Sequence, residues 1–385
     1  MKALGTMLYF ATALGWAAVG ALGFWGEMPA YAPHAWLSLA VGGAMLSLYA
    51  IQWTYRPSGA AWPERAAEPR RIGLRWIDYV KAAISWLHAF KHTYAIEPGL
   101  YYVGERYDRD APLLVTSNYH LTVFTVLRHV GSLNVRLLVV DTDGINVWCA
   151  AGKGRFSNAA IEEQLGRYER ELLTEKTWMT LVLPKLAFAG VDIRGLREKK
   201  IRPLIGPVYA KDLPAYLSQK KLTSQRDDQV VFGFVSRLFT WLPGFLQAMG
   251  YTLAAALILV VAQGGWVSEA PLVLLGVSAV IATVYPLLFP FIPGRRFAVK
   301  GLWLSGLVSL GLAGLYAAGM LETSVFVPTL LFTIASGMFF GLAYTGNSAV
   351  SNYSRIRAET ARFLPIEALF YTASLIAFVS FGVWG

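Results

Sequence analysis

The chain of 385 residues is 55% hydrophobic and only 15% charged, a composition that is too apolar for a soluble protein and indicates a membrane protein. Its formal net charge of +10 does not indicate nucleic-acid binding, because the Lys and Arg residues gather beside hydrophobic stretches, where the positive-inside rule explains them. The single cysteine excludes an intramolecular disulfide, a four-cysteine zinc site and an iron–sulfur cluster held by this chain alone. Electrons for a redox step must therefore come from a partner.

Two hydrophobic stretches near the start of the chain are long enough to span a membrane. They run from Leu4 to Trp25 and from Trp36 to Tyr55, and their length and immediate succession indicate a retained hairpin instead of a signal peptide. The next segment is rich in Pro, Ala, Glu and Arg, which is the composition of a linker. We therefore assign residues 1–55 to an N-terminal transmembrane hairpin and residues 56–92 to a linker and an amphipathic helix.

The amphipathic helix is predicted over residues 74–92. Its apolar face consists of Ile77, Val80, Ile84 and Leu87, and its polar face of Asp78, Lys81, Ser85, His88 and His92. We expect this helix to lie along the membrane surface or to cap the soluble domain. His88 and His92 are one helical turn apart, but no carboxylate or cysteine joins them in a metal-binding spacing, so we interpret them as solvated polar residues.

Between Ala111 and Leu217, short β-rich runs alternate with helical runs. The β-rich runs are Leu113–Thr116, Arg136–Val140, Thr180–Leu183 and Ile201–Ile205, and the helical runs are Leu121–Val130, Ala159–Leu173 and Asp212–Leu217. The alternation predicts a parallel, doubly wound, Rossmann-like sheet within residues 93–240. Ligands of such sheets bind beyond the carboxyl ends of the strands, so Thr116–Asn118 and Asp141–Cys149 should meet in one pocket.

The only cysteine follows one of these strands. Asp141-Thr142-Asp143-Gly144 is a turn sequence and Asn146 is a favourable N-cap, so Cys149 should lie in the first turn of a short helix. The helix N-terminus and Lys153 should lower the pKa of the thiol and make it a metal ligand. The alternative is a buried structural cysteine. Lys153 and Arg155 could likewise bind acidic groups of a ligand or form a solvated face.

Five further hydrophobic spans follow, and they predict a transmembrane domain over residues 241–385. They are Pro243–Ala262, Pro271–Ile292, Leu302–Met320, Phe326–Tyr344 and Leu364–Trp384. The loops near Glu269 and Glu322 lack basic residues, whereas those near Arg296 and Arg357 are basic. By the positive-inside rule, the soluble domain lies in the cytoplasm, the C-terminus lies outside, and the chain is a multi-pass protein of the cytoplasmic membrane.

Prolines and one acid stand out in these spans. Pro286, Pro290 and Pro328 should kink their helices. Glu367 lies near the start of the last predicted span, where we expect an interfacial position and not a place in an ion path.

The segment Asn146-Val147-Trp148-Cys149-Ala150-Ala151-Gly152-Lys153 resembles the cap-helix motif of the mercury-methylating corrinoid proteins, the HgcA family, at all eight positions. The likeness covers residues 93–240 and includes the segments Glu97–Tyr101, Leu114–Tyr119, Asp141–Gly154, Leu183–Leu186, Gly206–Tyr209 and Asp212–Pro214. The five C-terminal spans also fit this family, which is related to the corrinoid iron–sulfur protein of acetyl-CoA synthesis. The N-terminal hairpin departs from its layout, and Ser117 and His120 stand where the family has Ala and Lys.

The resemblance implies a membrane-bound, corrinoid-dependent methyltransferase. Cys149 would supply a thiolate as the lower axial ligand of cobalt in a base-off, cobalamin-type corrinoid, and the methyl group of methyl-cobalt(III) would pass to Hg(II) and give methylmercury. The residues implied to bind the corrinoid are Asn146, Val147, Trp148, Cys149, Ala150, Ala151, Gly152, Lys153, Thr116, Asn118, Asp141, Thr142 and Gly144. The implied partners are a two-cluster ferredoxin-like companion protein and a folate-linked methyl donor protein.

Two other functions remain open from the sequence. One is a membrane-bound corrinoid methyl carrier of acetyl-CoA-type one-carbon metabolism that acts on another acceptor, although its relatives carry an iron–sulfur domain that one cysteine cannot supply. The other is a transporter with an α/β sensing domain, which would bind no chromophore. Nucleotide cofactors have no support, because Gly152-Lys153-Gly154 lacks the upstream glycine of a P-loop and no dinucleotide-binding motif follows a strand.

Overall fold

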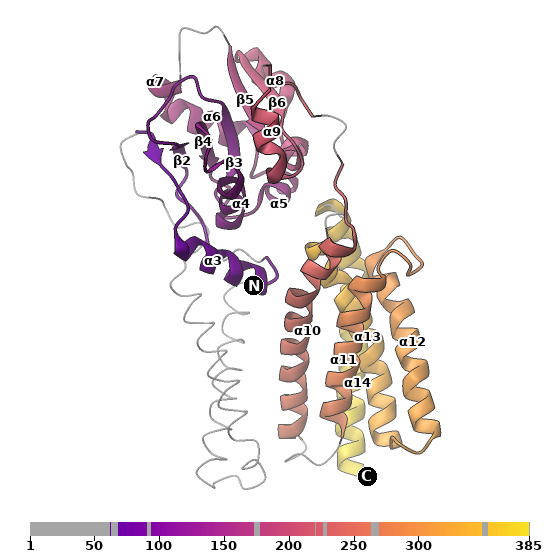
Figure 1. Ribbon diagram of the computed structural model, residues 1–385. Coiled ribbons are helices and arrows are strands. Elements are labelled where there is room, and N and C mark those ends of the chain that lie inside the picture. Colours follow the sequence, from indigo (N-terminus) through magenta and orange to yellow (C-terminus); the bar gives the residue numbers. More distant parts are fainter. Residues whose placement is uncertain are drawn as a thin grey trace. The chain divides into compact units, whose positions relative to one another are not determined.

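The computed structural model describes residue 62 and residues 68–90, 94–172, 178–219, 221–225, 229–262, 269–348 and 353–384. The chain divides into an α/β unit, Arg56–Val231, and a helical unit that begins at Phe232 (Figure 1). The predicted N-terminal hairpin, residues 1–55, lies outside the described residues.

The α/β unit contains a six-stranded sheet in the order β1-β2-β4-β3-β5-β6. The strands are β1 (Arg70–Arg71), β2 (Gly99–Val103), β3 (Leu113–Ser117), β4 (Val135–Val140), β5 (Met179–Leu183) and β6 (Ile201–Ile205). The four predicted strands, β3 to β6, are parallel to one another. The prediction of a wholly parallel sheet is wrong at β2, which pairs antiparallel with β4 along its whole length. The sheet is therefore mixed.

The two central strands are buried on both faces. Every residue of β3 and β4 is buried, as expected for strands that have helices packed on each side. The edge strand β6 contains Pro203, and an edge is where a strand tolerates a residue that has no backbone N–H to donate. The carboxyl ends of β3 and β4 thus lie side by side in the most rigid part of the sheet.

Helices cover both faces of the sheet. They are α3 (Trp76–Leu87), α4 (His120–Val130), α5 (Val147–Gly152), α6 (Asn158–Arg167), α7 (Glu169–Leu172), α8 (Ile193–Glu198) and α9 (Leu213–Leu217), with the 3₁₀ segments η2 (Lys185–Gly190) and η3 (Ala210–Asp212). Side chains of α4 and α9 share one hydrophobic core with the sheet. Side chains of α5, α6, α7 and α8 share a second core on the other face. This two-sided arrangement is the doubly wound architecture that the alternating pattern predicted.

The amphipathic helix α3 packs with its polar face inward. Asp78 and Ser85, which the sequence placed on a solvated face, are buried, whereas Trp76 and Leu87 are 76% and 41% exposed. The reason is that Asp78 Oδ1 lies 3.1 Å from His120 Nε2 at the start of α4, and its other oxygen accepts a hydrogen bond from the Arg75 N–H. The helix therefore caps the α/β unit through polar contacts. Its placement on a membrane surface stays a prediction, and His92 lies outside the described residues.

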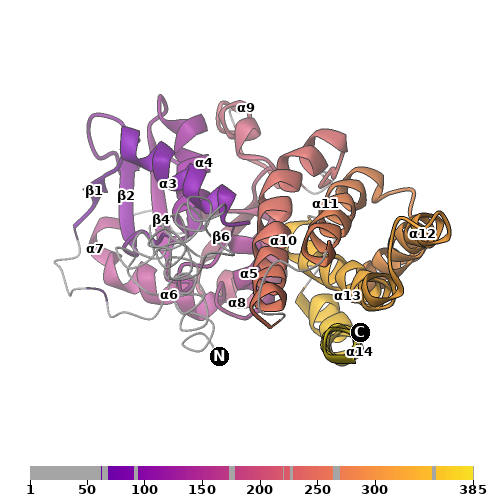
Figure 2. The same cartoon turned by 90° about the horizontal axis from the view of Figure 1, so that it is seen from below.

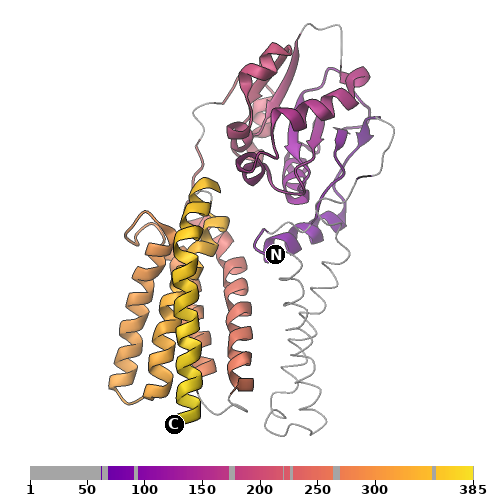
Figure 3. The ribbon, with the colours of Figure 1, turned by 180° about the vertical axis from the view of Figure 1, so that it is seen from behind.

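The helical unit consists of long helices. They are α10 (Phe234–Ala262), α11 (Ala270–Leu288), α12 (Phe297–Ala317), α13 (Thr323–Asn347) and α14 (Tyr353–Trp384). Four of these, α11 to α14, are long and apolar enough to cross a membrane. The fifth predicted span, Pro243–Ala262, falls within α10, but α10 is not among those four, so five C-terminal spans remain a prediction. The longest helix, α14, is drawn in yellow and runs the length of this unit (Figure 3).

Close backbone contact joins α12 to α13. An ideal Cβ on Gly301 would collide with the backbone of Gly337, and one on Gly341 would collide with the backbone of Phe297. Glycine at these positions therefore sets the separation of the two helices. Helix α12 lies at one edge of the helical unit, and α13 lies further inside it (Figure 2).

The prolines, the start of the last helix and Glu367 are the features of this unit for which the sequence made specific predictions. Pro286 and Pro328 lie inside α11 and α13, but Pro290 follows the end of α11 and kinks no helix. Helix α14 begins at Tyr353, well before the predicted start at Leu364. Its first turns contain charged residues, so the hydrophobic span in the sequence does not include them. Glu367 is consequently near the middle of α14 and only 4% exposed, and its interfacial position in a membrane stays a prediction.

Candidate functional site

The side chain of Asn118 organises the turn that carries the predicted site. Its Oδ1 atom accepts hydrogen bonds from the backbone N–H groups of Thr142 and Gly144, at 3.0 and 2.9 Å, and its Nδ2 group donates to Asp141 Oδ1 at 2.9 Å. Asp143 N–H donates to the same carboxylate oxygen at 3.0 Å. Asn118 and Thr142 are fully buried, so these bonds fix the loop after β4 to the end of β3.

The turn has the backbone conformation that its sequence favours. Asp143 and Gly144 both have positive φ, at 58° and 67°, which Asp, Asn and Gly adopt most easily. Thr142 Oγ1 lies 2.7 Å from the carbonyl oxygen of Ile145 and 2.9 Å from Asn118 Oδ1. The chain is thereby directed into α5 at a defined angle.

Helix α5 begins as the sequence predicted. The Asn146 side chain accepts a hydrogen bond from the Cys149 N–H at 2.9 Å, which satisfies one of the free donors at the helix start. Val147, Ala150 and Ala151 are buried in the core beneath, whereas Trp148 and Cys149 are half-buried. Cys149 packs against this core while part of it is exposed, so its role as a metal ligand and the alternative of a structural cysteine both stay predictions.

Helix α5 rests on η2, which follows β5. Gly190 makes this possible, because an ideal Cβ there would lie 2.9 Å from Ala151 Cα and would also collide with the Phe156 carbonyl oxygen. The Leu183–Leu186 segment, which leads from β5 into η2, therefore helps to hold the helix that contains Cys149. Three segments that are far apart in the sequence, at the ends of β3, β4 and β5, converge on this position.

The electrostatics of the thiol differ from the sequence prediction. Burial raises the pKa of the Cys149 thiol above its ordinary value, and this effect outweighs the opposing effects of the Asn146 hydrogen bond and the Lys153 charge. The prediction of a lowered thiol pKa is therefore wrong. A metal ion that binds this sulfur would have to displace the thiol proton.

The two basic residues after α5 have different surroundings. Arg155 Nε lies 3.1 Å from Asp143 Oδ2, so Arg155 forms an ion pair within the site itself. Lys153 is exposed at the end of α5 and contributes positive charge near the thiol. A contact of either residue with an acidic group of a ligand stays a prediction.

The predicted site residues come together in the structure. Those on the α5 side are Asn146, Val147, Trp148, Cys149, Ala150, Ala151, Gly152 and Lys153, and those at the strand ends are Thr116, Asn118, Asp141, Thr142 and Gly144. Gly152 and Asp141 are exposed, and Thr116 is buried in β3. The hydroxyl groups of Thr116 and Ser117 are buried and have no hydrogen-bond partner among the described residues.

The sequence missed two contacts that shape the site. The first is the buried pair of His120 and Asp78, which ties α4, directly after Asn118, to α3. Burial lowers the pKa of His120 although Asp78 opposes this, and the pKa of Asp78 is also lowered, through its bonds to His120 and Arg75, despite burial. The second is the Arg155–Asp143 ion pair. Of the residues in these two contacts, only His120 stood out in the sequence, because the HgcA family has Lys at that position.

These features define an α/β domain with a half-buried thiol at the carboxyl edge of its sheet. Residues 91–196, which include β2 to β5 and α5, match the family described as CO dehydrogenase/acetyl-CoA synthase delta subunit. The match covers the turn, the cysteine helix and η2, whereas the helical unit lies outside it.

Among curated proteins, the chain is similar to acetyl-CoA decarbonylase/synthase complex subunit gamma 2 of Methanosarcina thermophila. The two are 33% identical over 129 residues, which are 32% of this chain and 27% of the relative. Subunit gamma of the same complex from Methanopyrus kandleri is 32% identical over 130 residues, which are 33% of this chain and 27% of the relative. The chain thus spans little more than a quarter of the length of these relatives. Its α/β unit is related to subunits of acetyl-CoA synthase-type complexes.

Proposed function

We propose that this chain is a membrane-bound corrinoid protein that transfers a methyl group to Hg(II) and so produces methylmercury, with the Cys149 thiolate as an axial ligand of the cobalt. The observation that carries the proposal is the position of the only cysteine. It is half-buried in the first turn of α5, on a turn fixed by Asn118. The resemblance of the eight-residue motif to the mercury-methylating family supports the choice of acceptor.

The residues of the site fit a corrinoid. Thiolate is a soft, strongly donating ligand that suits a transition metal, and Cys149 is open enough to reach one. When bound, the corrinoid would supply a cobalt centre that takes up and gives up a methyl group. The chain itself supplies the ligand and its orientation.

Each neighbouring residue has a role in holding that ligand. Asn146 bonds the Cys149 N–H and so fixes the first turn of α5, and Asn118 fixes the turn before it. Metal binding requires the thiol to lose its proton, which Lys153 favours and burial opposes. Asp141 is exposed at the strand ends and would be available to the corrinoid, whereas Thr116, Thr142 and Gly144 are buried and would shape the loop that holds α5.

The methyl carrier of acetyl-CoA-type metabolism is the second candidate. The names of the related gamma subunits favour it, since they belong to acetyl-CoA decarbonylase/synthase complexes. Against it stands the single cysteine among the 385 residues, which cannot hold an iron–sulfur cluster. We keep Hg(II) as the proposed acceptor for this reason and because of the motif.

The partners follow from the same chemistry. A two-cluster ferredoxin-like companion would deliver electrons, and a folate-linked protein would deliver the methyl group. Soft Hg(II) travels on thiols, and Cys149 would be occupied, so we propose that Hg(II) arrives as a thiolate complex from the companion or from a small thiol. Membrane lipid surrounds the apolar helices, and the α/β unit lies in the cytoplasm.

The decisive assay combines the corrinoid-loaded protein, a methyl donor, the reduced companion and Hg(II)-thiolate, and it measures methylmercury. We expect product with the wild-type protein and none above background with Cys149→Ala. Transfer of the methyl group to another acceptor, with no methylmercury formed, would replace mercury methylation by the methyl-carrier function. Colourless protein after corrinoid loading would exclude both.

The orientation has its own test. Glu269 is exposed before α11, and Arg296 precedes α12 on the basic side. In a Cys149→Ala background, Glu269→Cys should react with an impermeant thiol reagent in intact cells, and Arg296→Cys should react only after the cells are opened. The reverse pattern would place the α/β unit outside.

A further inference from the structure

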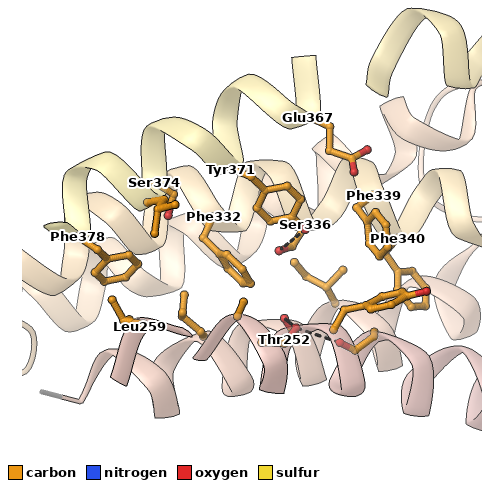
Figure 4. A pocket seen from close by; sticks show the side chains of 17 residues that line it. Thr252, Leu259, Phe332, Ser336, Phe339, Phe340, Glu367, Tyr371, Ser374 and Phe378 are labelled. Atoms are coloured by element: carbon orange, nitrogen blue, oxygen red, sulfur yellow. Dashed lines mark hydrogen bonds between the residues drawn. The ribbon is translucent and has the colours of Figure 1, made fainter. Parts of the chain in front are cut away.

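The helical unit contains a cavity of about 460 Å³ that the proposed function does not use. Helices α10, α11, α13 and α14 line it, mostly with aliphatic and aromatic side chains. The carboxyl group of Glu367 lies toward one end of the lined space, and Phe378 and Leu259 lie at the other (Figure 4). Cavities of this size and apolar lining are typical of small-molecule sites.

Glu367 is the unusual member of the lining. It is 4% exposed, and its Oε2 atom has no hydrogen-bond partner among the described residues. Glu359, on the same helix and equally buried, provides the contrast. Its Oε2 atom accepts a hydrogen bond from the Phe297 N–H at 2.8 Å, and its Oε1 atom lies 3.4 Å from Arg355 Nε. The fold thus provides partners for both carboxyl oxygens of Glu359, whereas Oε2 of Glu367 has no hydrogen-bond partner among the described residues.

The remaining polar groups of the cavity are already bonded within the protein. Thr252 Oγ1 donates to Ser278 Oγ at 2.7 Å, and Ser336 Oγ lies 3.2 Å from the Tyr371 hydroxyl oxygen. Ser374 donates to a backbone carbonyl oxygen. The carboxyl group of Glu367 is therefore the polar group of the lining that a ligand could satisfy.

The charge of that ligand follows from the lining. Among the described residues that line the cavity there is no Lys, Arg or His. A carboxyl group in this place either keeps its proton or pairs with a cation, and a cation would have to arrive with the ligand. The aromatic rings of Phe332, Phe340 and Tyr371 would contact an apolar body and could also stabilise a nearby cation.

We propose that this cavity binds an apolar molecule that carries one protonated amine, with the ammonium group paired to Glu367 and the body between α10, α11, α13 and α14. The proposal does not rest on corrinoid chemistry, since every lining residue belongs to the helical unit. It assigns a ligand-binding role to helices that otherwise serve as an anchor.

The test uses the full-length protein in lipid nanodiscs and a medium-chain alkyl amine that carries a photoreactive diazirine. We expect saturable labelling of peptides from α13 or α14 that contain the lining residues. The matched alcohol has the same chain without the charge, so it should bind at least about tenfold more weakly, because an ion pair with hydrogen bonds contributes 1.5 kcal/mol or more.

Substitutions locate the contact. Glu367→Gln keeps the shape of the side chain and should reduce amine binding to the level of the alcohol. Glu322→Gln removes an exposed acid at the start of α13 and should leave binding unchanged. Ala255→Phe fills the cavity and should abolish labelling by both probes.

Two results would overturn the proposal. Equal binding of the amine and the alcohol to the wild-type protein would mean that the cavity accepts only acyl chains of lipid. Undiminished, saturable amine labelling in Glu367→Gln would place the amine elsewhere. The first comparison needs no variant, so it decides the question even if a substitution prevents folding.

Discussion

Two buried polar side chains, Asn118 in the α/β unit and Glu367 in the helical unit, have different surroundings. In the α/β unit, the amide of Asn118 bonds four groups of the loop after β4, and Asp78 is paired with His120. In the helical unit, glycine-mediated backbone contact joins α12 to α13, while Glu367 has an unpaired carboxyl oxygen. The difference separates polar groups that build the fold from a polar group that is left for a ligand.

The largest effect should come from Asn118→Ala. The substitution leaves the buried N–H groups of Thr142 and Gly144 without acceptors and frees the turn before α5. We expect the free energy of unfolding of the α/β unit to fall by about 3 to 4 kcal/mol, with loss of corrinoid binding. Pulse proteolysis in urea measures this within the full-length protein.

The matched control for that substitution is Asn134→Ala. Asn134 is exposed, and its amide donates to Asp108 at the surface. Its loss should change stability by less than about 0.5 kcal/mol. Equal effects of the two substitutions would contradict the role given to Asn118.

A smaller effect is expected for Gly337→Leu in the helical unit. The new side chain would have to displace α12, whose backbone at Gly301 lies against it. Overpacking of this kind should destabilise the helical unit by about 2 to 3 kcal/mol, measured by unfolding in increasing detergent denaturant. Gly314→Leu, at a position on α12 with nothing within 4 Å of an added Cβ, should be neutral or slightly stabilising. Indistinguishable variants would mean that close backbone contact does not hold α12 to α13.

The smallest effect concerns pH. The pKa of His120 is lowered in the folded protein by burial, so below the ordinary pKa of histidine the unfolded chain binds more protons than the folded one. Stability should therefore fall as the pH drops from near neutral toward the lowered pKa of His120. The lowered pKa of Asp78 acts in the same direction at more acidic pH. His120→Gln should flatten the first part of this profile, and a profile that keeps its full slope would assign it to other groups.

The elements that the sequence predicted well are those with strong local patterns. The buried β-branched runs of β3 and β4, and the N-cap Asn146 before α5, depend on residues that are neighbours in the chain. The antiparallel pairing of β2 was missed because strand direction depends on the path of the chain and not on the composition of Gly99–Val103.

Burial was the quantity that the sequence could not supply. The pattern of α3 identified two faces, but only the position of His120 determines that the polar face packs inward. The thiol of Cys149 shows the same limit, because its motif indicated a lowered pKa and desolvation reverses the sign. For Glu367, the sequence indicated a place in the last span but not that its side chain is almost fully buried.

The central claim is that Cys149 ligates the cobalt of a bound corrinoid, and X-ray absorption at the cobalt edge tests it most directly. The corrinoid-loaded wild-type protein should show a sulfur atom in the first coordination shell. Cys149→Ala should show none, and Asn134→Ala should match the wild type. A wild-type spectrum without sulfur, or a Cys149→Ala spectrum that retains it, would contradict the account.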